Sequence, residues 1–101
     1  MTETLSKVEL ELFERMGEAC EEVEFYVRER WSESLYGVDF DMEGKAVVVT
    51  LSDFDLRVDE ADIENIRRMI ERHGLTVDHY VVSVKAGDLA DAVIRFYVAL
   101  V

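Results

Sequence analysis

The chain has no proline, and its only cysteine is Cys20. A lone cysteine cannot form an intramolecular disulfide, and it has no second cysteine with which to build a zinc knuckle. We therefore expect Cys20 to be a small buried hydrophobic residue. No linker or low-complexity segment interrupts the sequence, and its length suits one folding unit. These features predict a single domain over residues 1–101.

Long hydrophobic runs are also missing. The longest apolar stretch is about half of the roughly 20 residues that a membrane-spanning helix needs. The N-terminal segment lacks the apolar core of a secretory signal peptide. We therefore expect a cytoplasmic protein with no membrane partner.

Positive charge is scarce, because 11 basic residues stand against 23 acidic ones, which gives a net charge of −12 at pH 7. Nucleic acids would repel such a chain, so no nucleic-acid partner is expected. Most of the basic residues are arginines. This acid-rich, lysine-poor composition resembles that of cytoplasmic proteins of halophilic archaea, where molar salt shortens the Debye length to about 3 Å. An ordinary acidic mesophilic protein remains the alternative.

Recognisable catalytic motifs are absent: there is no Gly-rich phosphate loop, H-E-x-x-H, C-x-x-C or nucleophile elbow. We therefore expect neither a cofactor nor a metal site. The pairs Asp39/Asp41 and Asp53/Asp55 each share a strand face, but such pairs arise by chance in so acidic a chain. A small enzyme that uses His79 and a carboxylate is kept as an alternative. It would need a cleft that holds the two groups within hydrogen-bonding distance.

Apolar residues at alternating spacings of three and four predict a helix from about Ser6 to Ser32. A straight helix of this length spans about 40 Å, more than the width of a compact domain of this size. We expect it either to bend or break at Gly17 or to project and pack on a neighbour. A second helix is predicted from the N-cap Asp59 to Gly74, where glycine suits a left-handed terminator.

Four strand-like segments follow these patterns: "LYGVDFDM", "KAVVVTLSDF", "LTVDHYVVSVK" and "DAVIRFYVALV". The first two form a predicted hairpin around Glu43 and Gly44, with positive φ at the glycine and Val38 paired with Val49. The last two form a second hairpin around residues 86–88. The C-terminal segment also has helical spacing, but its β-branched and aromatic residues favour a strand.

The predicted order of elements is thus α-β-β-α-β-β. If the two hairpins meet through their second strands, the sheet is antiparallel throughout and has the strand order 1-2-4-3. The expected fold class is α+β, a two-layer α/β sandwich with helices packed on a four-stranded sheet. The C-terminal strand is then central, which accounts for its apolar character.

The two faces of this central strand predict a partner. One face carries Ile94, Phe96, Val98 and Leu100. The other carries Val93, Arg95, Tyr97, Ala99 and Val101, which Tyr80, Val82 and Val84 of the adjacent strand are expected to join. Two helices can cover one face, and monomers seldom leave a large apolar patch in water. We therefore expect a homodimer with twofold symmetry, with another protein partner as a further option. The alternative is that the first helix splits at Gly17 and covers both faces.

Arg95 is a charge within the most apolar strand, and a buried guanidinium needs a partner. A two-residue turn in the second hairpin puts Arg95 opposite Tyr80 or Asp78, on the face of Tyr97. This predicts either an ion pair, within the chain or between subunits, or a pocket for an anionic ligand with Arg95 as anchor and Tyr80 and Tyr97 as walls. Three functions are therefore considered: a non-catalytic homodimeric interaction or assembly module, a sensing module that binds an anionic ligand, and a small enzyme.

Overall fold

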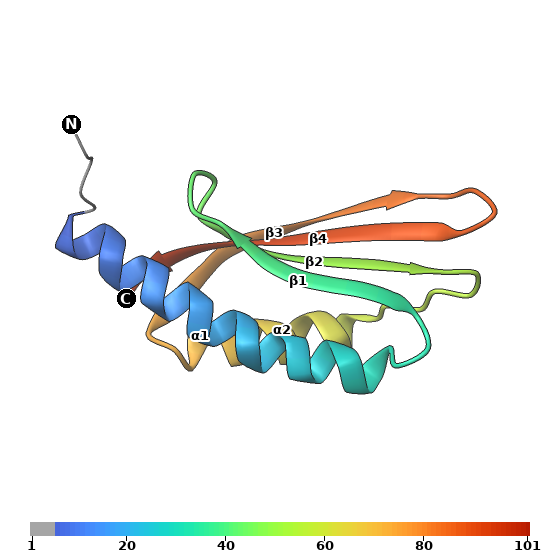
Figure 1. Cartoon of the computed structure of the whole chain (residues 1–101), viewed down its shortest axis with the longest axis horizontal. Coiled ribbons are helices and arrows are strands. Elements are labelled where there is room, and N and C mark those ends of the chain that lie inside the picture. The colour runs from blue at the N-terminus through green and yellow to red at the C-terminus, as the bar shows by residue number, and fades with distance from the viewer. Residues whose placement is uncertain (1–5) are drawn as a thin grey trace.

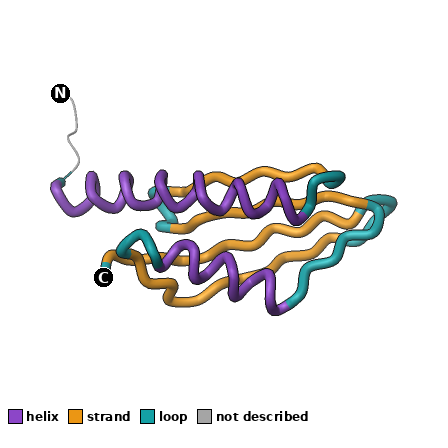
Figure 2. Tube along the Cα trace, turned by 90° about the horizontal axis from the view of Figure 1, so that it is seen from below, coloured by secondary structure: helices purple, strands orange, loops and turns teal. Residues whose placement is uncertain are grey.

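The structure is a computed structural model that describes residues 6–101. Its elements are α1 (Lys7–Arg30), β1 (Leu35–Asp41), β2 (Ala46–Asp53), α2 (Glu60–Glu71), β3 (Leu75–Lys85) and β4 (Ala90–Leu100). The sheet is antiparallel with the order β1-β2-β4-β3, so the predicted α+β fold, element order and strand order are confirmed. Both helices cover the same face of the sheet (Figures 1 and 2). No helix within the described residues is long and apolar enough to cross a membrane.

Helix α1 begins at a capping box, in which the backbone N–H of Glu9 donates to Ser6 Oγ at 3.1 Å. It continues through Gly17 without interruption, which excludes a break there, one of the alternatives left open by the sequence. Its 24 residues span about 36 Å. They lie along a sheet whose longest strands have 11 residues, in a molecule 46 Å long (Figure 1). The alternatives for this helix were based on the width of a nearly spherical domain, and the molecule is elongated.

The core lies between the helices and the sheet face turned toward them. Its largest buried side chains come from all the layers and include Met16 and Val23 of α1, Ile66 and Ile70 of α2, and Leu51, Ile94 and Phe96 of the sheet. The other side of the sheet, which we call the open face, has no helix of residues 6–101 over it (Figure 1). Burial along β4 alternates accordingly, because every second residue faces the core.

The boundaries of α2 follow its predicted signals. Asp59 is the N-cap and forms a reciprocal capping box with Asp62. Gly74 has a φ of 74°, as expected for a left-handed terminator. Signals within a few residues therefore determine both ends of this helix.

The first hairpin has the predicted register, with Val38 opposite Val49. Its turn is longer than predicted, because residues 42–45 separate the last pair, Asp41 and Ala46. Positive φ occurs at Lys45 (54°) and not at Gly44, which corrects that prediction. The register survives because residues 42–45 and the predicted two-residue turn have the same centre, so the same side chains remain opposite each other.

The second hairpin has a different register from the predicted one. Residues 86–90, an odd number, separate its last pair, Lys85 and Asp91. Arg95 therefore lies opposite Val81, not opposite Tyr80 or Asp78. A shift of one residue turns a strand over relative to its neighbour, so every β3 side chain from His79 to Lys85 lies on the face opposite to the one predicted.

Candidate interaction surface

Arg95 lies in the middle of the open face. The pairing places Asp39, Val48, Arg95 and Val81 in one row across the four strands. Arg95 is exposed, and it shares a shallow hollow of about 560 Å³ with Asp39 and Asp41. Within residues 6–101 it forms no ion pair, so the predicted internal bridge to an aspartate is not made there. Because water can hydrate the exposed guanidinium, the single chain does not need such a bridge.

The two predicted pocket walls lie on opposite faces of the sheet. Tyr97 is on the open face, where its ring stacks on His79 with the centroids 4.5 Å apart. Tyr80 is on the helix side, and its ring centroid lies 6.0 Å from that of Phe96. The structure therefore does not bring Arg95, Tyr80 and Tyr97 into one pocket. The predicted grouping is corrected because it depended on an even-numbered turn in the second hairpin.

His79 has a carboxylate beside it but no enclosing cleft. Its Nδ1 lies 2.7 Å from Asp78 Oδ2. The side chains of His79 and Asp78 are 56% and 78% exposed. Such exposure gives a substrate no enclosed site beside the imidazole. No group of three or more His, Cys, Asp or Glu side chains suited to a metal ion occurs within the described residues.

The tip of the β3–β4 hairpin extends past the helices, so part of the helix-side face remains uncovered (Figure 1). Tyr80, Val82 and Val84 lie there, with exposed fractions of 47%, 43% and 66%. Together with apolar side chains such as Leu56 and Ile63 they line a groove of about 300 Å³. We call it the β3 groove. The apolar surface that was expected on the open face is thus divided between the two faces.

The adjoining strand edge is also unpaired. Among the described residues, 6–101, β3 pairs only with β4, and the stretch from His79 to Lys85 is regular, because the one irregularity of the ladder lies between Val77 and His79. We call residues 79–85 the β3 edge. It contains no acidic residue. The opposite edge strand, β1, is shorter and carries Asp39 and Asp41. Charged side chains normally protect edge strands from pairing with other chains, and the β3 edge has only Lys85 for this purpose.

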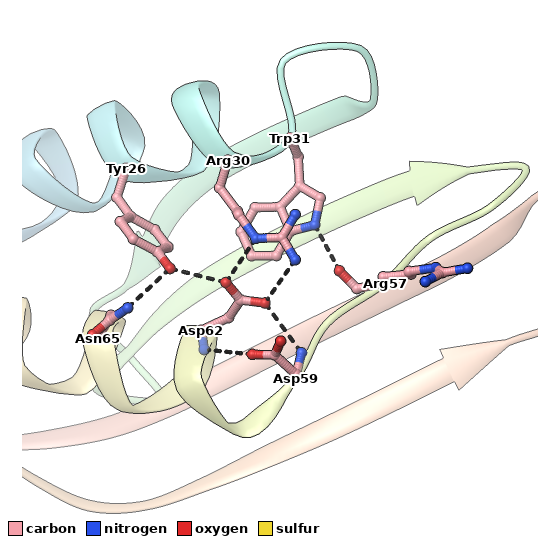
Figure 3. A network of polar contacts seen from close by, with 7 residues as sticks. All are labelled: Tyr26, Arg30, Trp31, Arg57, Asp59, Asp62 and Asn65. Carbon is pink, nitrogen blue, oxygen red and sulfur yellow. Dashed lines mark hydrogen bonds and ion pairs between the residues drawn. The ribbon is translucent and has the colours of Figure 1, made fainter.

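A buried acid contacts Asp59, one of the residues that line the β3 groove (Figure 3). Asp62 is 3% exposed and accepts hydrogen bonds from Arg30 Nε at 3.0 Å, Arg30 Nη2 at 3.3 Å, Tyr26 Oη at 2.9 Å and the Asp59 backbone N–H at 3.1 Å. These donors fill its acceptor capacity, so Asp62 joins the end of α1 to the first turn of α2 and has no free lone pair for a ligand. Burial raises the pKa of Tyr26 above its ordinary value.

Sequence reasoning missed this junction. To predict the junction, the sequence would need a signal that connects Arg30 with Asp62, but these residues lie far apart in the chain and share no periodic spacing. Trp31 extends the same contact, because its Nε1 donates to the Arg57 carbonyl at 2.9 Å. The guanidinium of Arg30 lies 5.1 Å from the centre of the Trp31 ring. The junction therefore also holds the segment between β2 and α2.

Polar contacts also join the helices at the other end of α2. The imidazole of His73 lies between two carboxylates of α1, 3.7 Å from Glu18 and 3.6 Å from Glu22. Arg15 donates to the His73 carbonyl at 3.2 Å. These contacts give His73 a structural position between the helices, away from the β3 groove.

Cys20 is buried, as predicted. Burial, with smaller contributions from the negative charges of Asp39 and Glu24, raises the pKa of its thiol to about 12. A thiol that stays protonated at neutral pH is a poor nucleophile and a poor metal ligand.

Neither a protein-family model, nor a curated protein, nor a solved structure matches this chain. Any functional assignment therefore depends on the surface itself.

Proposed function

We propose that the protein is a non-catalytic interaction module that assembles as a homodimer through the β3 edge. One observation carries this proposal: the edge is unpaired, apolar and free of acidic residues on a chain of net charge −12. Two other stretches of comparable length without acids are the core segments of β2 and β4, and both strands already have neighbours on both sides. The β3 edge is thus the place where two copies can meet without opposing carboxylates.

The energetics support an association of moderate strength. Tyr80, Val81, Val82 and Val84 are each roughly half exposed. Covering the exposed half of such a side chain contributes about 1 kcal/mol, which amounts to about 8 kcal/mol for two copies. New backbone hydrogen bonds add to this, and the loss of translational and rotational freedom costs about 4 to 15 kcal/mol. We therefore expect a dimer that forms at micromolar or higher protein concentration.

The charge of the chain bears on where such a module works. Two copies with a charge of −12 each repel one another in dilute buffer. In molar salt the Debye length falls to about 3 Å, and this repulsion is screened. We accordingly place the module in the cytoplasm of a salt-adapted cell.

The two alternative functions have less support. An anion at Arg95 would also meet Asp39 and Asp41 in the same hollow, and their charge opposes its binding. Catalysis by His79 would require enclosure, whereas its side chain is more than half exposed. Neither alternative needs the unpaired backbone of the β3 edge.

Light scattering over protein concentrations of about 10 to 500 µM, in about 2 M KCl, tests the proposal. We expect twice the chain mass at the upper end of this range for the native protein. Val82→Asp should be monomeric, because it places a carboxylate on the edge. Thr50→Asp is the matched control, since it adds the same charge at an exposed position of an interior strand and should leave the dimer intact. A native protein that is monomeric throughout would contradict the proposal.

A further inference from the structure

We infer that the two copies join through antiparallel β3 strands related by a twofold axis at Val82, so that their β3 grooves merge into one trough. This inference rests on the proposed homodimer and specifies its geometry. Three observations carry it: the length of the regular edge, the positions of its side chains and charges, and the location of the groove.

The regular part of the edge selects the axis. Residues 79–85 pair continuously with β4, while the irregularity between Val77 and His79 limits the segment at one end and the hairpin turn after Lys85 limits it at the other. In a twofold antiparallel pair, the sequence numbers of any two opposing residues add up to the same value. Only an axis at Val82 pairs all residues of this segment, because it places His79 opposite Lys85 of the second copy. Any other register leaves part of the straight edge unpaired.

The side chains agree with this register. Opposing residues in an antiparallel pair point to the same face. On the helix side, Val82 then meets its own copy and Tyr80 meets Val84 of the second copy, so the exposed apolar residues of the β3 groove cover one another. On the open face, Val81 meets Ser83. Directly opposed side chains of this kind lie about 4.5 to 5.5 Å apart at Cβ, which is close enough to exclude water.

The charges agree as well. Lys85, the one cationic side chain always charged on this edge, comes opposite His79, whose ring contacts the Asp78 carboxylate at 2.7 Å. The twofold axis forms this contact twice, once at each end of the seam. Each ammonium therefore approaches a carboxylate, and no carboxylates face each other across the paired segment.

The symmetry also decides where the grooves lie. A twofold axis between antiparallel edge strands is perpendicular to the sheet, so both helix layers lie on the same side of a continuous sheet of eight strands. Tyr80, Val82 and Val84 line the groove of each copy and stand at the seam. The two grooves therefore meet there and form one trough between the two α2 helices, with a mostly apolar lining that also includes Asp59 and Glu60 of each copy.

Cysteine cross-linking tests the register. It is done in a Cys20→Ser background, because this substitution removes the only native thiol. Val82→Cys and Val81→Cys are a matched pair, since both side chains are 43% exposed on the same strand. At an axis through Val82, the thiols of two Val82→Cys chains are directly opposed, whereas those of two Val81→Cys chains are offset along the seam by about 7 to 8 Å. Under mild oxidation we expect the Val82→Cys protein to form a covalent dimer at least about ten times faster than the Val81→Cys protein.

A mixture of Val81→Cys with Ser83→Cys provides the second measurement, because these positions oppose each other in the inferred register. We expect a covalent heterodimer there, identified by tags of different length. Faster cross-linking of Val81→Cys alone would overturn the axis at Val82 while leaving the homodimer intact. A dimer by light scattering with no cross-link in any of these variants would exclude the β3 edge as the interface. A monomer by light scattering would instead contradict the proposed function.

Discussion

Replacing Asp62 with alanine tests whether the buried junction between α1 and α2 stabilises the fold. The substitution removes the acceptor for the hydrogen bonds from Arg30, Tyr26 and the Asp59 backbone. The tyrosine bond and the helix cap each contribute about 1 kcal/mol. The Arg30 pair adds about 1 kcal/mol, a discounted value, because the arginine side chain is 40% exposed and regains water when its partner is lost. The expected loss in the free energy of unfolding is therefore about 3 kcal/mol.

Urea or thermal unfolding followed by circular dichroism measures this loss. For a domain of this size, about 3 kcal/mol corresponds to a fall in Tm of roughly 10 to 20 °C. Asp62→Asn keeps the shape and one carbonyl acceptor, so it should lose about half as much. Asp55→Ala is the control, because its carboxylate is 87% exposed and its removal should change stability by less than about 0.5 kcal/mol.

If the free energy of unfolding of Asp62→Ala lies within about 1 kcal/mol of that of the native protein, the junction does not stabilise the fold as described. Tyr26→Phe separates the contributions, because it deletes the hydroxyl that donates to Asp62 and accepts from Asn65 Nδ2 at 3.2 Å, and it should cost about 1 kcal/mol. In the Asp62→Ala background the same change should cost much less, since its acceptor is already gone. A full cost there would mean that the hydroxyl acts through another contact.

Three further predictions concern local conformation, the buried thiol and salt. Gly74→Ala should lower the free energy of unfolding, measured in urea, by about 1 kcal/mol, because the φ of 74° at this position is unfavourable for alanine. Gly17→Ala should raise the same free energy by a similar amount, because a Cβ at this helical position meets no atom within 4 Å. Cys20 should react with a thiol reagent at pH 8 only after denaturation. The thiol of Cys20 keeps its proton up to about pH 12 in the folded chain and releases it near pH 9.0 in the unfolded chain. The free energy of unfolding should therefore fall as the pH rises above 9.0, and it should fall less in Cys20→Ala. The Tm should rise between dilute buffer and about 2 M KCl, and melts independent of salt would contradict the inferred salt adaptation.

Much of the fold could be predicted because its signals are local. The caps of α2 at Asp59 and Gly74 depend on hydrogen bonds and backbone angles of adjacent residues. The apolar stripe of α1 depends on helical spacing, which is fully contained in the sequence. The exclusion of crossed connections then left the strand order β1-β2-β4-β3 as the simplest arrangement, and the structure has it.

The candidate surface was predicted only in part. Sequence patterning identified β3 as an apolar strand, but it placed Tyr80 beside Arg95 on the open face. The face of a β3 side chain depends on whether the connection to β4 contains an odd or even number of residues, and the sequence of residues 86–90 gives no strong preference. The contact of Asp62 with Arg30 was missed because it joins two elements through space, with no spacing to indicate it.

The sequence by itself therefore determined the elements, their order along the chain, the ends of α2 and the face of each helix that becomes buried, because these follow from interactions within a few residues. Only the tertiary structure decided that α1 lies unbroken along an elongated sheet, that the open face carries Arg95 exposed, and that the apolar side of the β3 tip lies next to α2. These outcomes depend on the relative positions of whole elements. A shift of one residue between two strands exchanges their faces at almost no local cost, and only the packing of the complete chain selects between the two.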